Sequence, residues 1–525
     1  MSGAVEDTLE VWKPSFNPWL IAASVMLATF MEVLDTSVAN VSLPHIAGNL
    51  SATTEESTWV LTSYLISNAI ILPATNWLGY FFGRKRFLIV CIAIFTLSSA
   101  LCGAATSLGM LLFARILQGA GGGALQPIAQ AVLLESFPAE KRGSAMAVYG
   151  MGIVVAPIIG PTMGGWITDN YSWRWIFYIN VPIGILAVLM TNMFVEDPPY
   201  IRGQRPGRID YIGFSLMALG LATLQIVFDK GQEEDWFSSS FITKVTIIAV
   251  VALVAFIIWE LRTKEPIVNL RVLANRNFAV GTALITAMGV VLYGTIALLP
   301  LFLQTLLGYP ALESGLAVSP RGLGAIVSMI LVGRLIGKID GRYLIIFGFC
   351  LVGFSTYLLA DIDLEISMRS IVWPQIIAGF AMGFVFVPLT VMATGRLSNE
   401  QIGNATGIFN LMRNVGGSFG IAIVTTMLAR GSQAHQAAMV SHLTPYDPAF
   451  QQRLSGIISS MASRSDLMTA SQQAYGAVYA ILVRQATLLA YIDNFRLMAF
   501  LCLVCAPAAL LFKRVRAGKS APPLH

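Results

Sequence analysis

The segment Pro18–Val38, with the sequence PWLIAASVMLATFMEVLDTSV, decides the fold class of this chain. It is apolar almost throughout, and as a helix it is long enough to cross the ~30 Å hydrocarbon core of a bilayer. Two carboxylic acids, Glu32 and Asp35, lie near its end without a basic residue beside them. Acids are expensive inside a membrane, so the segment predicts a membrane helix and also a place where function resides.

Thirteen further stretches of this kind follow, so we predict an all-α polytopic protein with fourteen spans. The composition agrees, because 56% of the residues are hydrophobic and 12% are charged, whereas soluble proteins carry about 25% charged residues. An ordinary soluble domain is thereby excluded. The predicted spans are 18–38, 57–79, 87–106, 109–134, 144–168, 174–194, 209–228, 241–261, 278–303, 315–333, 343–361, 371–395, 405–428 and 490–512.

Lys and Arg gather in alternate loops. The loops after spans two, four, six, eight and ten are basic, whereas those after spans one, three, five and nine hold neither residue type. Basic loops stay on the cytoplasmic side, so both termini are predicted to be cytoplasmic, as tails 1–17 and 513–525. These loops also explain the net charge of +5, and we expect no nucleic-acid partner. The basic loop residues include Arg84, Lys85, Arg86, Lys141, Arg142, Arg202, Arg205 and Arg208.

A long polar segment, 429–489, precedes the last span on the outer side. Its part from Arg453 to Arg484 has an apolar stripe typical of one or two amphipathic helices. We therefore expect a folded outer lobe. Such a lobe has three possible roles, which are gating the exit, docking a partner, and covering the bundle.

Other chemistries find no support in the sequence. Cys502 and Cys505 form a C-x-x-C pair, but they lie in the last apolar span without a second ligand pair, which favours packing over metal or redox chemistry. The four histidines form no zinc pattern, and no phosphate-binding loop follows a strand. We expect no metal, no cofactor, no direct use of ATP and no enzymatic activity.

Several short motifs coincide along the chain. They are Leu34–Pro44 (LDTSVANVSLP) at the end of the first span, Arg115–Gly119 (RILQG) in the fourth, the glycines and prolines of Gly152–Gly165 in the fifth, and Trp173–Pro182 (WRWIFYINVP) at the sixth. Together they resemble the fourteen-span drug:proton antiporters of the major facilitator superfamily, and the likeness to inner-membrane multidrug pumps extends along nearly the whole chain. One loop departs from the pattern, because 76–85 (NWLGYFFGRK) lacks the leading Gly and the Asp of the family motif. A charge relay through that Asp is therefore doubtful in this chain.

The resemblance implies a 6 + 2 + 6 arrangement. Residues 18–200 would form one six-helix bundle, 201–264 an inserted pair of helices, and 265–512 a second bundle that includes the outer lobe. Substrate would bind between the bundles, which would rock to give alternating access. The proton would be the coupling ion. The resemblance also implies a periplasmic membrane-fusion adaptor and an outer-membrane channel as partners, with the pump in a bacterial inner membrane.

Asp35 and Glu32 are the first candidate residues for proton coupling. They are three residues apart, hence on roughly one face of a helix. A carboxylate in the bilayer costs several kcal/mol unless it is neutralised or paired, and proton transfer or cation binding commonly explains such residues. The alternative is that both acids lie near the outer interface in contact with water. Asp35 also occupies the acidic position of the family motif.

Arg115 and Gln118 are the other two coupling candidates. Arg115 is the only basic residue in the fourth span, so we expect it to face the bundle interior and to have a partner. The resemblance implies a role in proton coupling, and the alternative is a structural bond to backbone carbonyls. Gln118 lies one turn further and is expected to share the same polar network.

The fifth span carries the antiporter signature. Gly160 and Gly164 form a small-xxx-small contact face, while the two prolines remove backbone hydrogen bonds and bend the helix. We expect a tightly packed helix that pivots or seals against leaks. The signature residues are Gly152, Pro157, Gly160, Pro161, Gly164 and Gly165.

A drug pocket should be apolar with a few polar groups, and Met and aromatic residues suit it because they repack around different ligands. The same residue types face lipid or neighbouring helices more often than ligand. The candidates for the substrate pathway are Met26, Phe30, Met151, Tyr293, Gln304, Phe386, Phe409 and Arg413.

The sequence thus favours proton-driven export of lipophilic, toxic small molecules. A dedicated exporter of a fatty acid, a siderophore or a metabolite is the alternative within the same class. A membrane-embedded enzyme or a receptor without net transport is the alternative from another class, but no cluster of catalytic residues supports it.

Overall fold

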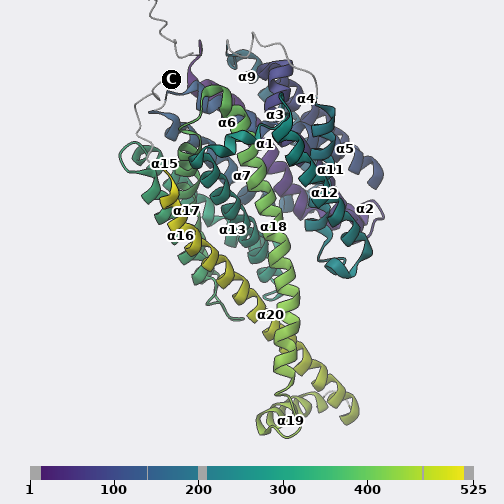
Figure 1. Cartoon of the computed structure of the whole chain (residues 1–525). Coiled ribbons are helices and arrows are strands. Elements are labelled where there is room, and N and C mark those ends of the chain that lie inside the picture. The colour runs from purple at the N-terminus through teal and green to yellow at the C-terminus, as the bar shows by residue number, and fades with distance from the viewer. Residues whose placement is uncertain (1–13, 139, 199–209, 464–465, 514–525) are drawn as a thin grey trace, which may run out of the picture.

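The computed structural model describes residues 14–138, 140–198, 210–463 and 466–513. Most of the tails expected at 1–17 and 513–525 lies outside these residues, as do Arg202, Arg205 and Arg208. Throughout the described part the regular structure is helical, without strands, and fourteen helical segments are long and apolar enough to cross a membrane. The predicted all-α, fourteen-span fold is confirmed (Figure 1).

Single helices form eleven of these segments. Three segments combine two helices each: α5 and α6 in Leu108–Ser136, α8 and α9 in Trp175–Phe194, and α14 and α15 in Glu313–Leu335. The helices are α1 (Pro18–Val41), α2 (Leu43–Asn49), α3 (Thr54–Phe82), α4 (Arg84–Gly103), α5 (Leu108–Gly122), α6 (Leu125–Ser136), α7 (Arg142–Asn170), α8 (Trp175–Tyr178), α9 (Asn180–Phe194), α11 (Tyr211–Lys230), η1 (Trp236–Ser238), α12 (Ser240–Arg262), η2 (Leu270–Ala274), α13 (Arg276–Thr305), α14 (Ala311–Val318), α15 (Pro320–Leu335), α16 (Gly341–Leu358), α17 (Met368–Thr394), α18 (Asn399–Val440), α19 (Pro448–Ala462), α20 (Leu467–Ala508) and η3 (Ala509–Leu511).

The helices pack in two groups with a pair beside them. In the first group α1 packs on α6, α7 and α9, and α5 packs on α3 and α4. In the second, α17 packs on α15 and α16, while α18 and α20 pack on each other and on α13. The α11–α12 pair meets both groups, through contacts of α11 with α3 and α18, and α7 reaches across to α14, α15 and α17. On the side of the first group, the interface with the second is therefore formed by α3 and α6, which contact α18, and by α7.

The contact between α1 and α7 depends on the glycines of α7. A methyl group on Gly160 would lie 2.5 Å from Ser37 Cβ, and one on Gly164 would lie 2.8 Å from Val38 Cγ1, so only glycine permits this approach. Pro161 has no N–H and leaves the carbonyl of Pro157 without its helical donor. Ser37 Oγ donates to that carbonyl at 3.1 Å. Another helix thus restores the hydrogen bond that the proline removes.

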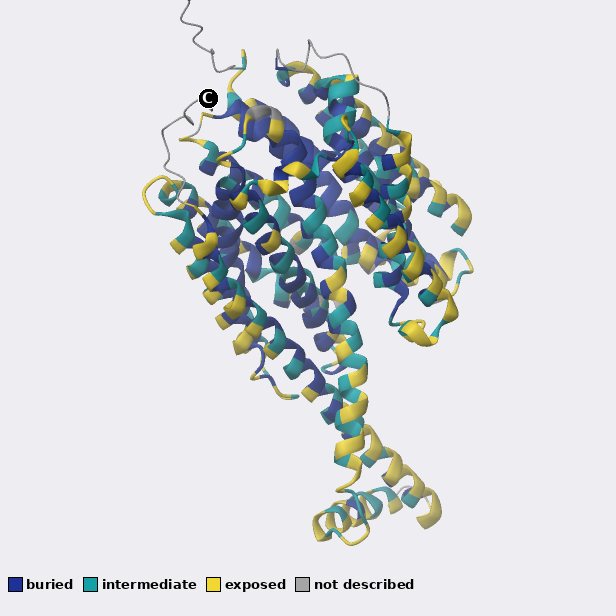
Figure 2. Cartoon of the chain, viewed as in Figure 1, coloured by how far each residue is buried: buried dark blue, intermediate teal, exposed yellow. Residues whose placement is uncertain are grey.

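The last two spanning helices continue far beyond the membrane. The sequence predicted spans at 405–428 and 490–512 with a separate lobe between them, but α18 and α20 are 42 residues each, about 60 Å at 1.5 Å per residue. Figure 1 shows α18 and α20 leaving the bundle and ending at α19. The expected outer lobe is thus largely a continuation of two spans, and we call 429–489 the stalk. Figure 2 shows it to be mostly exposed.

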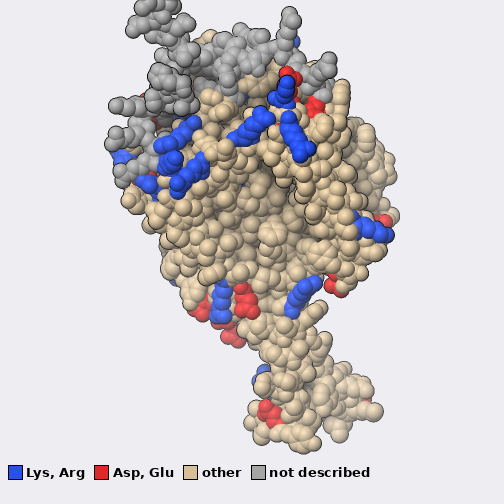
Figure 3. All heavy atoms as spheres, viewed as in Figure 1, with Lys and Arg blue, Asp and Glu red and all other residues tan. Residues whose placement is uncertain are grey.

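Charge is distributed along the molecule as expected for a membrane protein. On the face seen in Figure 3, Lys and Arg gather near the end opposite the stalk, and the middle of the bundle shows almost no charged side chains. Large apolar side chains are exposed along this middle part, among them Leu97, Phe113 and Leu189. Lipid is the solvent that such a surface requires.

The α1–α7 contact gives a first prediction. Ala normally stabilises a helix over Gly by about 1 kcal/mol, but we expect Gly160→Ala to lower the free energy of unfolding by about 1–3 kcal/mol because its methyl group overpacks against Ser37. The matched control is Gly476→Ala in the stalk, where a methyl group meets nothing within 4 Å. Unfolding in mixed micelles measures both, and equal stabilisation by the two substitutions would contradict the close approach.

Candidate functional site

A fully buried ion pair lies at the centre of the first helix group. Arg115 Nη1 of α5 donates to Asp35 Oδ2 of α1 at 2.6 Å, and the two side chains are 0% and 1% exposed. The expectation that Arg115 faces inward with a partner thus agrees with its position. Asp35 lies in the bundle interior rather than at the outer interface. The pair joins α1 to α5, two helices between which few other contacts exist to define their register.

Neutral donors complete the surroundings of Asp35. Gln118 Nε2 and Asn180 Nδ2 both donate to Asp35 Oδ1, at 2.9 and 2.7 Å. Gln118 is on the same face of α5 as Arg115 and also accepts from Arg115 Nη1 at 2.8 Å. Asn180, the first residue of α9, brings a third helix to the carboxylate. Such donors stabilise a buried charge that would otherwise be costly.

The guanidinium of Arg115 has further partners on α3. Its Nε donates to the carbonyl of Val60 at 3.0 Å, and its Cζ lies 4.3 Å from the ring centroid of Tyr64. A cation over an aromatic ring is attracted by the negative face of the ring. Its Nη2 has no hydrogen-bond partner among the described residues. The ion pair therefore has most, but not all, of the hydrogen bonds that it can form.

Glu32 has a separate set of donors. It is 3% exposed and accepts from Tyr64 Oη at 3.1 Å, from Asn68 Nδ2 at 3.3 Å and from Gln126 Nε2 at 2.6 Å. Asp35 and Glu32 lie on one side of α1, but they accept hydrogen bonds from different residues. Tyr64 connects their surroundings, because its ring contacts Arg115 while its hydroxyl binds Glu32.

The Glu32 network crosses to the second helix group through Gln126 of α6. While the amide nitrogen of Gln126 donates to Glu32, its oxygen accepts from Arg413 Nη2 of α18. Beside this link, Asn410 Nδ2 donates to Gln130 Oε1 at 2.7 Å and Thr406 Oγ1 donates to the carbonyl of Pro127 at 3.2 Å. We call the series Asp35, Arg115, Tyr64, Glu32, Gln126 and Arg413 the polar chain. It runs from the interior of one group to the other.

The antiporter-signature residues line the contact between α7 and α1. Gly160 and Gly164 meet Ser37 and Val38 as described, and a methyl group on Gly152 would clash with the end of Met26. Pro157 and Pro161 lie between these contacts, and Gly165 is half-buried on the next turn. The signature therefore holds α7 against the helix that carries both acids.

The candidate pathway residues divide into two sets. Phe386 stacks on Tyr149 with ring centroids 6.2 Å apart, and Tyr149 Oη donates to the carbonyl of Gln126, so these residues adjoin the polar chain. Arg413 is itself a member of the polar chain, whereas Met26 packs against Gly152 of α7. Phe409 is buried one turn before Arg413, and Tyr293 packs against Gly417.

The remaining candidates are not gathered at the polar chain. Gln304 is exposed near the end of α13 and donates to Ser314 Oγ at 3.4 Å. Phe30 packs in the cluster around Val33 and Leu34. Met151 is half-buried on α7.

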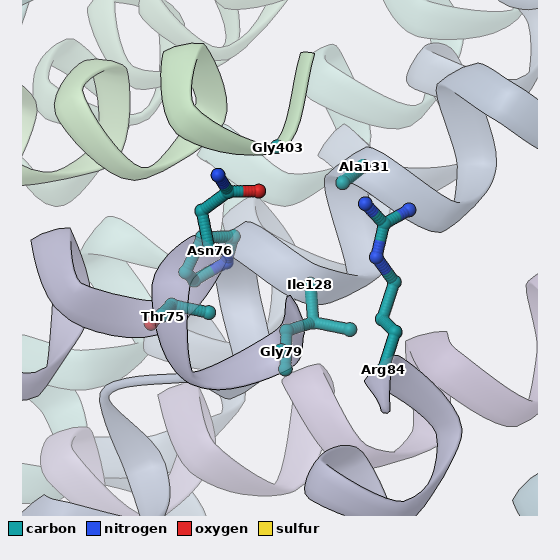
Figure 4. Close-up of a pocket in the computed structure, with 8 residues that line it drawn as sticks. Thr75, Asn76, Gly79, Arg84, Ile128, Ala131 and Gly403 are labelled. Atoms are coloured by element: carbon teal, nitrogen blue, oxygen red, sulfur yellow. The ribbon is translucent and has the colours of Figure 1, made fainter. Parts of the chain in front are cut away.

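The atypical loop after the second span is held by carboxylates from elsewhere in the chain. Gly83 has φ +85°, a conformation that favours glycine. Arg84 pairs with the buried Glu135 of α6, and the backbone N–H of Lys85 donates to Asp197 Oδ1 at 2.7 Å. Figure 4 shows Arg84 and Asn76 beside a small cavity that Gly403 of α18 closes. The loop 76–85 is thus bound by two acids from outside it, Glu135 and Asp197.

Sequence reasoning missed four residues of the site: Tyr64, Asn68, Gln126 and Asn180. Each is a buried polar residue in an apolar span, which is the available signal, because such groups require hydrogen-bond partners. Asn180 was quoted in a family motif but not assigned to the site. The choice among many such polar residues depends on helix rotation, which the sequence pattern does not specify.

A family model described as Major Facilitator Superfamily matches residues 25–421. The chain belongs to the major facilitator superfamily. This agrees with the fold: the human organic anion transporter MFSD10 has a TM-score of 0.57 and 14% identity, covering 93% of this chain and 100% of its own. The proton:xylose symporter XylE gives the same TM-score and identity over 89% of this chain and 94% of its own. At such identities these likenesses concern the fold alone.

Two relatives by sequence are similar over most of their length. The multidrug export protein EmrB of Escherichia coli (strain K12) is 39% identical over 433 residues, covering 82% of this chain and 84% of that protein. The fatty acid resistance protein FarB of Neisseria gonorrhoeae is 37% identical over 506 residues, 96% of each chain. The resemblance drawn from the motifs is confirmed. This superfamily member is a multi-pass protein of the bacterial inner membrane, and its relatives indicate a transporter rather than an enzyme.

The buried ion pair gives a second prediction. Removing one partner leaves an uncompensated buried charge, so we expect Arg115→Met to lower the free energy of unfolding by about 3–5 kcal/mol. The double variant Asp35→Leu with Arg115→Met should be more stable than either single variant, because no charge remains buried. Unfolding in mixed micelles measures this double-mutant cycle. Strictly additive effects would contradict a direct pair.

Proposed function

We propose that this transporter exports hydrophobic or amphiphilic toxic compounds across the inner membrane in exchange for protons. The observation that carries the proposal is the polar chain, in which two buried carboxylates connect to the interface between the helix groups. The likeness to the multidrug export protein EmrB supports the substrate class. Secondary active transport with the proton as coupling ion and no other cofactor is part of this proposal.

The contacts suggest how a proton moves the helices. Protonation of Asp35 removes the counter-ion of Arg115, so the guanidinium is drawn toward its other acceptors, among them Gln118 and the carbonyl of Val60. Protonation of Glu32 removes its negative charge and makes one oxygen an O–H donor, which weakens the hydrogen bonds that it accepts here from Tyr64 and Gln126. Freed from Glu32, Gln126 no longer fixes Arg413. Proton binding thereby loosens the link between the groups, as alternating access requires.

A dedicated exporter of fatty acids is the second candidate. The observation favouring it is the 37% identity to the fatty acid resistance protein FarB over 96% of both chains. Buried acids and an interface between two helix groups are compatible with export of many toxic compounds and with export of fatty acids alone. Only a transport panel separates the two candidates.

We further propose that the pump acts with a periplasmic membrane-fusion adaptor and an outer-membrane channel. The stalk supports this assignment, because it extends two spanning helices beyond the bilayer and exposes Tyr446, Leu467 and Met468 at 94%, 71% and 75%. Exposed apolar residues at the end of a projecting element are suited to protein contacts.

Proton flux tests the proposed exchange. In inside-out vesicles with an acid interior, adding several unrelated lipophilic compounds should release protons, and Asp35→Asn should abolish the release at matched expression because the carboxylate proposed to carry the proton is gone. Asp363→Asn, in an exposed loop, is the matched control and should behave as the wild type. Release for fatty acids alone would establish the dedicated exporter. No release by a correctly folded wild type for any compound would refute proton-coupled export of this panel.

A further inference from the structure

We propose that Arg413 binds the acidic head group of amphiphilic organic anions, so that carboxylates with an apolar body form one substrate class of this transporter. The proposal rests on the proposed export function and assigns its substrate class to one residue. The observation behind the proposal is that the acceptor groups bonded to the Arg413 guanidinium are neutral.

Arg413 is a buried cation without a carboxylate of its own. It is 4% exposed in the middle of α18, and it forms no ion pair with any residue in the described ranges, whereas Arg115 pairs directly with Asp35. Among the described residues its Nη2 donates to two neutral amide oxygens, those of Gln126 and Asn414. Its Nε is buried and has no hydrogen-bond partner in the same part of the chain. Buried arginines normally face a carboxylate or phosphate that matches their planar set of donors.

Gln126 lies between Arg413 and the carboxylate of Glu32. Glu32 binds the amide nitrogen of Gln126, while Arg413 binds the amide oxygen. A ligand carboxylate is a stronger acceptor for a guanidinium than an amide oxygen is. It can replace the oxygen of Gln126 and also reach the free Nε–H, which makes the fork-like, two-bond contact that Arg favours.

Apolar side chains lie close to Gln126, the partner of the guanidinium, and suit the body of such a ligand. Phe409 lies four residues before Arg413, hence on the same face of α18. Across from it, Phe386 stacks on Tyr149, whose hydroxyl donates to the Gln126 carbonyl. Met329 of α15 reaches the same place, since a methyl group on Gly150 would lie 2.8 Å from its Cε. Aromatic and Met side chains come from α15, α17 and α18, and they adapt to chains of different shape.

Equilibrium binding to the full chain in nanodiscs tests the assignment, with empty nanodiscs for subtraction. The probes are decanoate, methyl decanoate and decyltrimethylammonium, which share one apolar tail and differ in charge. In the wild type, decanoate should bind at least about tenfold more tightly than its neutral ester, given the usual strength of hydrogen bonds to charged groups. Equal affinities would overturn the proposal, and this comparison needs no variant.

Variants then locate the charge. Arg413→Gln should abolish the preference for decanoate without weakening decyltrimethylammonium binding, because the loss of a buried cation does not disfavour a cationic probe. Arg413→Lys should retain part of the preference, and Arg453→Gln on the exposed face of α19 should match the wild type. Equal weakening of both charged probes by Arg413→Gln in a folded protein would show a structural role and overturn the assignment. If Arg413→Gln does not fold, the lysine variant decides: a preference as large as the wild type's argues against two-bond recognition.

The two levels of the proposal fail separately. Proton-driven transport of decyltrimethylammonium without preferential decanoate binding would refute the anion site and keep the export function. Preferential binding of decanoate without proton-driven transport of any probe would keep the site and refute the function.

Discussion

The structure depends on one constraint, which is that a charge within the hydrocarbon layer must find an opposite charge and enough hydrogen bonds inside the protein. The Asp35–Arg115 pair meets it with donors from α5 and α9 and an aromatic ring from α3. Four helices are thereby held in one arrangement around a single carboxylate. Any change in the charge of that carboxylate therefore alters contacts of all four helices. A proton-coupled mechanism requires such a connection.

The glycines and prolines of α7 serve the same centre from the other side. Because Gly160 and Gly164 lack side chains, α7 lies directly on the helix that carries both acids. Ser37 lies two residues after Asp35 and donates to the carbonyl that Pro161 leaves free. α7 also contacts α14, α15 and α17 of the second group. α1 is therefore connected to the group interface by the direct packing of α7 as well as through Gln126 and Arg413.

Hydropathy and basic loops were sufficient to predict fourteen spans, because the bilayer imposes a length and a polarity that any sequence must respect. The inward position of Arg115 followed in the same way, since lipid excludes its charge. Its partners Tyr64 and Asn180 did not follow, because pairing between spans depends on the rotation of each helix. The sequence did not predict that α18 and α20 continue into the stalk, because a helix can continue without an apolar sequence. The first turns of α20, after Leu467, are rich in Ala and Gln. They are helical although their composition is too polar for a membrane span.

Distances between the helix groups as a function of pH test the central claim most directly, namely that protonation along the polar chain shifts the groups relative to each other. Spin labels at Tyr171, at the end of α7, and Leu316, on α14, are both exposed. They report the separation by pulsed electron resonance after the native cysteines are replaced. The account predicts two distance populations whose ratio changes with pH in the wild type, and a ratio independent of pH when Asp35→Asn and Glu32→Gln are combined. An unchanged pH response in the double variant would contradict it.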